Sequence, residues 1–187
     1  MSERQRRSPG RNRSDRSGTA TLAPRLHLDP IEEAVRQWRT HGWDDAAPGM
    51  AIVTSVYRVQ QIFAARVTEV LQPFDLTFAR YEVLALLSFS RHGMLPIGKV
   101  GERLQVHATS VTNAVDRLER QGFVERRPHP SDRRAILAVI TRKGRAVVKA
   151  ATPPLNEVFA EVELSESEAT TLFDLLRKLR QAAGDFP

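Results

Sequence analysis

The sequence contains no cysteine, which excludes disulfide bonds, thiolate metal sites and thiol-based redox sensing for this chain. It also has no run of about 18 apolar residues, so it predicts no membrane-spanning helix. The Arg-rich N-terminus lacks the apolar segment of a secretory signal. From these absences we expect a soluble, cytoplasmic protein that does not bind membranes.

Signals of catalysis are missing as well. The sequence shows no Gly-rich phosphate loop, no His/acid metal spacing and no Ser/His/Asp context. Its five histidines are scattered, at positions 27, 41, 92, 107 and 129. We therefore expect no enzymatic activity, no metal site and no cofactor.

Charge is plentiful but unevenly distributed along the 187 residues, whose formal net charge is +6. Residues 1–26 hold seven arginines against two acidic residues, and their low apolar content predicts a disordered tail. Residues 116–145 carry nine basic and four acidic residues, whereas residues 155–176 carry six acidic residues and no basic one. A locally basic patch of this kind indicates a polyanionic partner.

The first ordered segment expected is a helix over residues 29–40, capped by Asp29 and followed by a linker that ends at residue 48. Apolar steps of three and four residues then predict a long amphipathic helix over residues 50–71, which Pro73 stops. Thr77 is a suitable cap for the next helix, in which Phe78, Tyr81, Leu84 and Ala85 share a face.

A helix-turn-helix is expected next, because short helices over residues 97–104 and 108–121 are separated by a three-residue turn. Val111, Val115 and Leu118 face inward on the second helix, and Gly122 ends it. Two short strands follow, joined by the charged tip "RRPHPSDRRAI". The first begins at Phe123-Val124 and is ended by Arg126 and Arg127, and the second spans residues 136–140. The fold class is therefore mainly α with a small β-wing, with the winged helix-turn-helix over residues 75–140.

Two C-terminal helices complete the prediction. One starts at Thr141 and must be kinked or broken at Pro153-Pro154. The other begins with the capping box of Ser165 and Glu168. The segments over residues 49–74 and 141–183 each have an apolar face that the motif is too small to cover, which favours dimerisation helices.

The outward face of helix 108–121 is the candidate for insertion into a DNA major groove, where its first residues would meet base edges. The candidate contacts on this helix are His107, Thr109, Ser110, Thr112, Asn113 and Arg117. In the wing, Asp132 can accept a hydrogen bond from the Arg134 guanidinium and aim it at a minor groove. The candidate wing residues are Arg126, Arg127, Asp132, Arg133 and Arg134.

The stretch "SVTNAVDRLERQGFVERRPHPSDRRAILAVITRKGR" resembles the winged helix-turn-helix of the MarR (multiple antibiotic resistance regulator) family. The similarity extends to "LTFARYEVLALL" and "LSESEATTLFDLLRKL", about residues 50–182. The resemblance implies an obligate homodimer that binds a pseudo-palindromic operator in double-stranded DNA, usually as a repressor released by a small ligand. It also implies that Arg134 is the wing-tip arginine and Asp132 its partner.

The added N-terminal helix resembles that of urate-responsive and related regulators in the same family, in which a tryptophan lines an anion pocket with an acidic residue. Trp38 and Glu82 occupy these positions here, although aspartate is usual at the second, and Arg80, Arg91 and His92 are further candidates for holding an anionic effector. The alternative is that Trp38 only packs its helix against the core.

A rival interpretation is a non-specific, chromatin-like DNA-binding protein that uses the tail and the wing for backbone contacts. Both interpretations predict salt-sensitive binding. Only a sequence-specific regulator predicts a large specificity ratio, typically ~10³ or more.

Overall fold

The computed structural model describes residues 27–132 and 134–187, so the predicted disordered tail and Arg133 lie outside the described residues. The chain divides into two compact units, Met1–Val56 and Tyr57–Pro187. The long helix α2 (Ala47–Leu71) runs through the boundary between them.

The first unit contains α1 (Pro30–Thr40) and the start of α2. As predicted, Asp29 caps α1, since its Oδ1 accepts a hydrogen bond of 2.8 Å from the N–H of Ile31. α2 begins at Ala47 and not at residue 50, so the linker is shorter than predicted. Pro48 is compatible with this earlier start, because the first turn of a helix needs no donor at that position.

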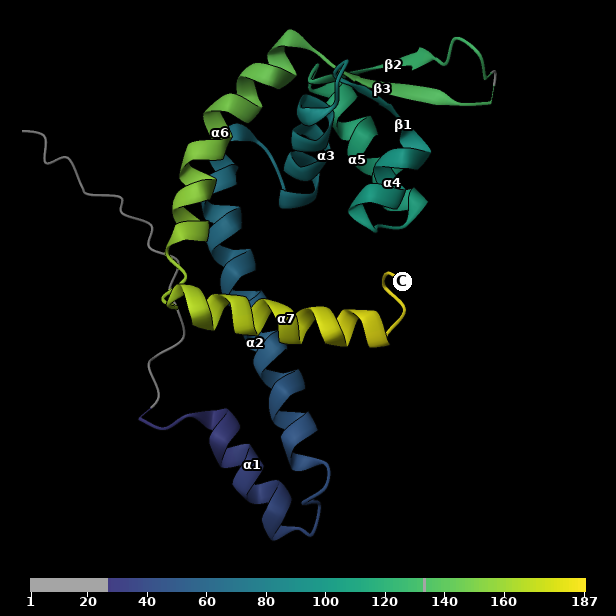
Figure 1. The fold of residues 1–187 in the computed structure, drawn as a ribbon. Coiled ribbons are helices and arrows are strands. Elements are labelled where there is room, and N and C mark those ends of the chain that lie inside the picture. Colours follow the sequence, from purple (N-terminus) through teal and green to yellow (C-terminus); the bar gives the residue numbers. More distant parts are fainter. Residues whose placement is uncertain (1–26, 133) are drawn as a thin grey trace, which may run out of the picture. The chain divides into compact units, whose positions relative to one another are not determined.

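The second unit is a winged helix-turn-helix followed by two helices (Figure 1). A short 3₁₀ turn, η1 (Gln72–Phe74), separates α2 from the motif. The remaining elements are α3 (Phe78–Phe89), β1 (Met94–Pro96), α4 (Ile97–Leu104), α5 (Ala108–Arg120), β2 (Val124–Pro128), β3 (Ile136–Ile140), α6 (Arg142–Ala160) and α7 (Glu166–Ala182). The predicted fold class, mainly α with a small β-wing, is confirmed.

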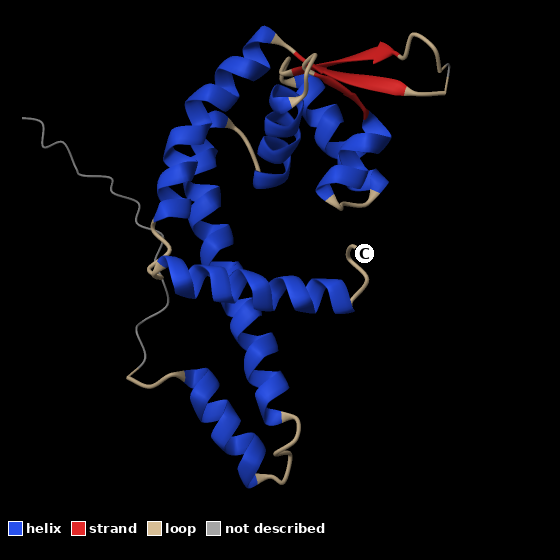
Figure 2. Ribbon diagram, viewed as in Figure 1, coloured by secondary structure: helices blue, strands red, loops and turns tan. Residues whose placement is uncertain are grey.

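The sheet is antiparallel, with strand order β1-β3-β2, and its strands are shown in red in Figure 2. β2 pairs with β3 from Val124↔Ile140 to Pro128↔Ile136, so the first wing strand ends one residue beyond the predicted end at Arg126 and Arg127. β1 was not predicted. It spans three residues, and only its pairing with the distant β3 makes it a strand.

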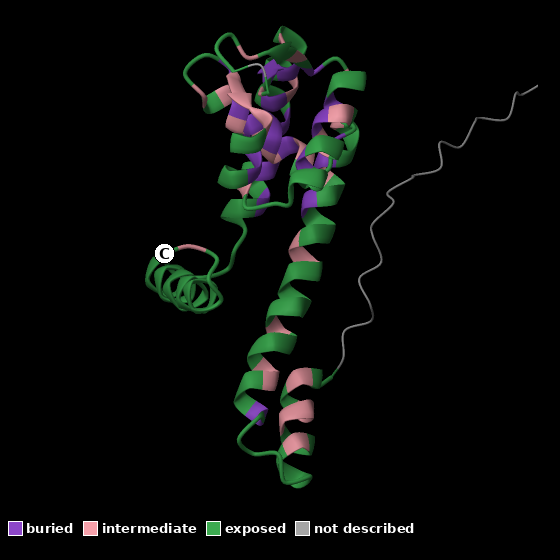
Figure 3. Cartoon of the chain, turned by 90° about the vertical axis from the view of Figure 1, so that its right-hand side faces the viewer, coloured by how far each residue is buried: buried purple, intermediate pink, exposed green. Residues whose placement is uncertain are grey.

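In the core of the second unit, α5 packs against α3, α4 and β2, and α3 packs against α6 (Figure 3, purple). The predicted inward residues Val111, Val115 and Leu118 are all buried. Gly122 has φ +74 and ends α5 as expected, because this left-handed conformation favours glycine. These contacts fix the orientation of α5, and with it the direction of its exposed face.

α6 is continuous through Pro153 and Pro154, so of the predicted kink or break, the break does not occur. The two prolines remove the N–H donors to the carbonyls of Lys149 and Ala150, which lie on the exposed side of the helix. Thr152, just before them, donates its hydroxyl to the Val148 carbonyl at 2.7 Å and lies 2.9 Å from the Tyr81 hydroxyl. These bonds, together with the burial of Leu155 and Val158, keep the helix intact on the core.

α7 begins with the predicted capping box of Ser165 and Glu168. All of its residues are exposed (Figure 3). Within the described part of the chain, no helix combines the length and apolar character needed to cross a membrane.

Candidate nucleic-acid interface

The turn between α4 and α5 sets the start of the candidate recognition helix. Gln105 adopts φ 53, and its left-handed backbone reverses the chain within three residues. His107 then caps α5, since its Nδ1 accepts a hydrogen bond of 3.3 Å from the N–H of Thr109. An imidazole therefore replaces the Ser, Thr or Asp side chain that is commonest at this position.

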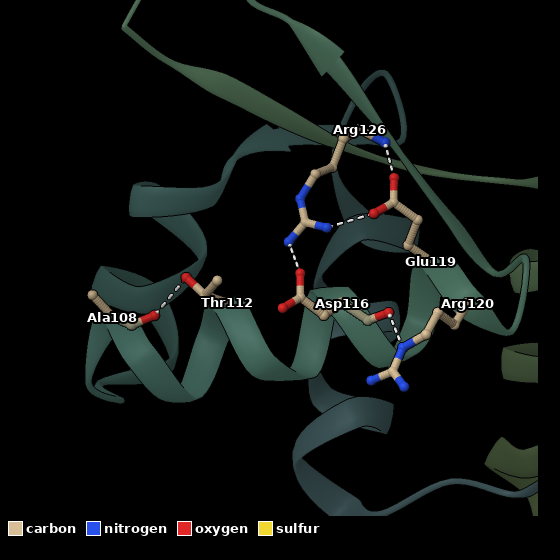
Figure 4. Close-up of polar contacts among 6 residues, drawn as sticks. All are labelled: Ala108, Thr112, Asp116, Glu119, Arg120 and Arg126. Carbon is tan, nitrogen blue, oxygen red and sulfur yellow. Dashed lines mark hydrogen bonds and ion pairs between the residues drawn. The ribbon is translucent and has the colours of Figure 1, made fainter.

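The predicted outward face of α5 is exposed except at Asp116, which is half-buried. Thr112 donates its hydroxyl to the Ala108 carbonyl at 3.0 Å, which leaves the hydroxyl oxygen as an acceptor (Figure 4). Asn113 and Arg117 have no side-chain hydrogen bond to any described residue, so their polar groups are available to a partner. The exposed candidates on this face are Thr109, Ser110, Thr112, Asn113 and Arg117.

Arg126 joins the wing to α5. Its guanidinium is ion-paired with Asp116 and Glu119, and its backbone N–H donates to Glu119 Oε1 at 3.2 Å (Figure 4). Burial acts to lower the pKa of Arg126, but the bonds to the two carboxylates outweigh it and the pKa is raised. Arg126 therefore stays charged and connects β2 to the recognition helix.

The wing tip differs in one contact from the prediction. Asp132 Oδ1 accepts a hydrogen bond of 2.9 Å from the backbone N–H of Arg134, where the prediction had the guanidinium as the donor. A carboxylate two residues earlier reaches the main chain more easily than a long side chain, as in other Asx turns. Arg134 is exposed, and Arg127 pairs with Glu125 at 2.8 Å on the exposed side of β2.

A groove of about 540 Å³ lies where α4, α5 and the wing meet. Its lining includes Thr112 of α5 and Arg134 of the wing, and also Lys99 of α4. Lys99 was not predicted as a site residue. Lys99 pairs with Glu102 at 2.6 Å. The sequence feature that could have predicted it is a basic residue in the first turn of the first helix of the motif.

Within the second unit, the basic residues predicted to bind an anionic effector do not all lie together. Arg80, in the first turn of α3, donates to Gln121 Oε1 at 3.1 Å. Arg91 and His92 follow the other end of the same helix, about 16 Å further along its axis. Glu82 is half-buried, and burial raises its pKa. Trp38 is in the first unit and packs edge-to-face on Trp43, with ring centroids 5.3 Å apart.

A more enclosed apolar groove, of about 680 Å³, lies among α2, α3 and α6. Phe63 and Val67 line it from α2, Phe78 from α3 and Phe159 from α6. Sequence reasoning missed this groove, because its walls come from helices that are far apart in the chain.

An exposed polar helix face beside a basic β-hairpin defines a winged helix-turn-helix DNA-binding protein. Comparison with known proteins agrees. A model of the MarR family matches residues 76–136. The structure of Sco5413, a MarR family transcriptional regulator from Streptomyces coelicolor, superposes on this chain with a TM-score of 0.67 and 53% sequence identity. The match covers 74% of this chain and 97% of Sco5413. This chain belongs to the MarR family of transcriptional regulators.

Two further relatives support the assignment. SarZ, a helix-turn-helix transcriptional regulator from Staphylococcus aureus, is 29% identical over 110 residues, which are 59% of this chain and 73% of SarZ. A variant of Escherichia coli MarR in complex with operator DNA is 25% identical, with a TM-score of 0.62 over 81% of this chain and 99% of that one.

Proposed function

We propose that this chain is a homodimeric repressor that binds a pseudo-palindromic operator and releases it when a small molecule binds. The observation that carries the proposal is the exposed, hydrogen-bonding face of α5 beside the wing. The first turns of α5 enter the major groove, where Asn113 reads adenine and Arg117 reaches guanine or phosphate. Arg134 enters the adjacent minor groove, while Arg127 contacts phosphate.

A second copy of the chain is the partner that the exposed helices require. Leu172, Phe173 and Leu179 of α7 are 45%, 59% and 53% exposed, although they form an apolar stripe. Ile52, Val56 and Val59 of α2 are also exposed. Apolar surface of this extent mostly marks an interface. A two-fold dimer would place two α5 helices about one DNA turn apart, which accounts for a pseudo-palindromic operator.

The effector site that we propose is the apolar groove among α2, α3 and α6. Phe63, Phe78 and Phe159 suit a flat, apolar molecule, and the groove borders both the helix before the motif and the helices assigned to the dimer. A ligand there would change the spacing of the two α5 helices. An anionic group on the ligand would need the second copy, because the basic residues predicted to hold it are not brought together.

The test is fluorescence anisotropy with DNA from upstream of the protein's own gene, compared with a scrambled duplex across a salt series. We expect two chains per site and an affinity for the upstream DNA at least ~10³-fold above that for the scrambled duplex. Equal affinities that vanish together as salt rises would favour a non-specific, chromatin-like binder.

A further inference from the structure

The tip of the wing is held by one histidine. The backbone N–H of His129 bonds to the Ala135 carbonyl at 3.1 Å and joins the two ends of the tip. The imidazole Nδ1 of His129 lies 3.3 Å from the N–H of Ser131 and 3.1 Å from the N–H of Asp132, and accepts from both. The Ser131 hydroxyl lies 3.4 Å from the same nitrogen. One ring nitrogen thus accepts the hydrogen bonds of both backbone N–H groups in the first half of the turn.

Asp132 completes the turn from the other side. Its carboxylate accepts the N–H of Arg134, and its carbonyl accepts the N–H of Ala135 at 3.1 Å. The position of Arg134 therefore depends on where Asp132 is held, and the N–H of Asp132 is held by His129. His129 is half-buried beneath the turn, as this role requires.

We propose that His129 is a positioning residue for DNA binding, and that it fixes the wing tip only while Nδ1 carries no proton. An imidazole accepts through Nδ1 when its proton is on Nε2. The imidazolium carries a proton on both ring nitrogens. Its Nδ1–H would then point at the N–H groups of Ser131 and Asp132 and could accept no hydrogen bond from them. Protonation therefore releases Asp132 and, through it, Arg134. This inference rests on the DNA-binding function proposed for the wing.

The charged groups around His129 do not replace this contact. On β2, Arg127 is paired with Glu125. Within the turn, Asp132 uses Oδ1 for the N–H of Arg134. Ile136, which begins β3, is apolar. Protonation of His129 should therefore lower operator affinity through loss of the ordered wing tip.

The first experiment uses the free protein and needs no DNA. Long-range ¹H–¹⁵N NMR of the imidazole reports which ring nitrogen is protonated. At pH 8 we expect the Nε2–H form of His129, and the amide signals of Ser131 and Asp132 should shift as that ring titrates. A proton on Nδ1 at pH 8, or amide signals that do not follow the ring, overturns the proposal whether or not the protein binds an operator.

The second experiment measures operator affinity at pH 8, 7 and 6 for three proteins at constant ionic strength. His129→Asn keeps a side-chain acceptor at a position suited to an Asx turn but does not titrate. We expect it to bind as the wild type does at pH 8 and to lose less affinity at pH 6. His129→Ala should bind roughly 3- to 30-fold more weakly than the wild type at pH 8, the size of effect that loss of one capping acceptor produces. This difference should narrow at pH 6, where the wild type has lost the same acceptor.

His41→Asn is the matched control, because His41 lies in the first unit and its Nδ1 contacts the Gln37 carbonyl instead. The operator affinity of His41→Asn should vary with pH as that of the wild type does. The positioning role is refuted if His129→Asn and the wild type share one pH profile, or if His129→Ala binds as tightly as His129→Asn. A wild type that does not distinguish operator from scrambled DNA at pH 8 would refute the proposed function instead, and the NMR result would still decide the contact.

Discussion

The guanidinium of Arg126 on β2 is ion-paired with the carboxylate of Asp116 on α5. The same guanidinium reaches Glu119 one turn further along the helix. One arginine thus connects the two elements assigned to DNA reading, the recognition helix and the wing. Its side chain is 23% exposed, less than either of its partners. This arrangement makes Arg126 a positioning residue and leaves phosphate contacts to its exposed neighbours.

Arg126→Ala should weaken operator binding by about 10-fold. Without its ion pairs to α5 the wing is less ordered, and ordering the backbone again on DNA costs about 1–2 kcal/mol of conformational entropy per residue. Stability should fall by only about 1 kcal/mol, since both carboxylates can be rehydrated. Denaturant unfolding and anisotropy measure the two effects. Arg126→Lys keeps the charge but cannot span both carboxylates, so it should show most of the loss. A reduced salt dependence in Arg126→Ala would instead mean that Arg126 contacts phosphate itself.

Arg134→Ala should reduce operator affinity by about 1–3 kcal/mol and leave the dimer intact, because Arg134 is exposed at the wing tip and packs against no core residue. Anisotropy gives the affinity, and light scattering gives the mass. Arg36→Ala is the control, since Arg36 lies on α1 and pairs with Glu33. Equal operator affinity for Arg134→Ala and wild type would refute the wing assignment.

Asn113→Ala should relax base preference at one operator position, at a cost of about 1–3 kcal/mol for the preferred base. Affinities for operators substituted one base pair at a time measure this. Arg120→Ala, on the same helix but in its last turn, should affect all sequences alike. If Asn113→Ala also weakens every sequence equally, the register of α5 in the groove is wrong.

Much of the motif could be predicted because its signals are local. The spacing of Val111, Val115 and Leu118 sets the buried face of α5, and the caps at Asp29 and Ser165 act within three residues. Such patterns need no knowledge of the rest of the fold. The polar residues left over on α5 are then predicted to be exposed by elimination. This is correct for Thr112, Asn113 and Arg117 but not for Asp116, which is half-buried and paired with Arg126.

Contacts between distant segments could not be predicted in this way. β1 becomes a strand only through β3, some 40 residues later. The pairing of Arg126 with Asp116 joins a strand to a helix whose relative orientation the core sets. Arg80 and Arg91, both candidates for holding an anion, lie apart for a related reason, because closeness in sequence becomes separation along a helix.

Leu176→Asp should abolish the dimer and, with it, operator binding. Leu176 is 37% exposed on the apolar stripe of α7, and an unpaired carboxylate buried in an interface costs several kcal/mol, at least about 100-fold in dimer affinity. Light scattering at a fixed protein concentration gives the mass. Lys178→Asp changes an exposed polar position of the same helix and should remain dimeric. A dimeric Leu176→Asp protein would exclude α7 from the interface.

Glu82→Gln should stabilise the protein at neutral pH and not at acidic pH. Burial raises the pKa of Glu82, so the folded state holds this proton more tightly than the unfolded chain. As pH rises through the raised pKa, the folded state must ionise a half-buried carboxyl, and wild-type stability falls relative to Glu82→Gln.

Glu168→Gln is the control of opposite sign, because hydrogen bonds from Ser165 lower the pKa of Glu168. The stability that Glu168 contributes is present above its unfolded pKa and is lost as pH falls, so Glu168→Gln should be the less stable protein at neutral pH. Unfolding midpoints from pH 4 to 7 at one protein concentration test both signs. Parallel curves for wild type and Glu82→Gln would show that the Glu82 carboxyl remains hydrated in the folded protein.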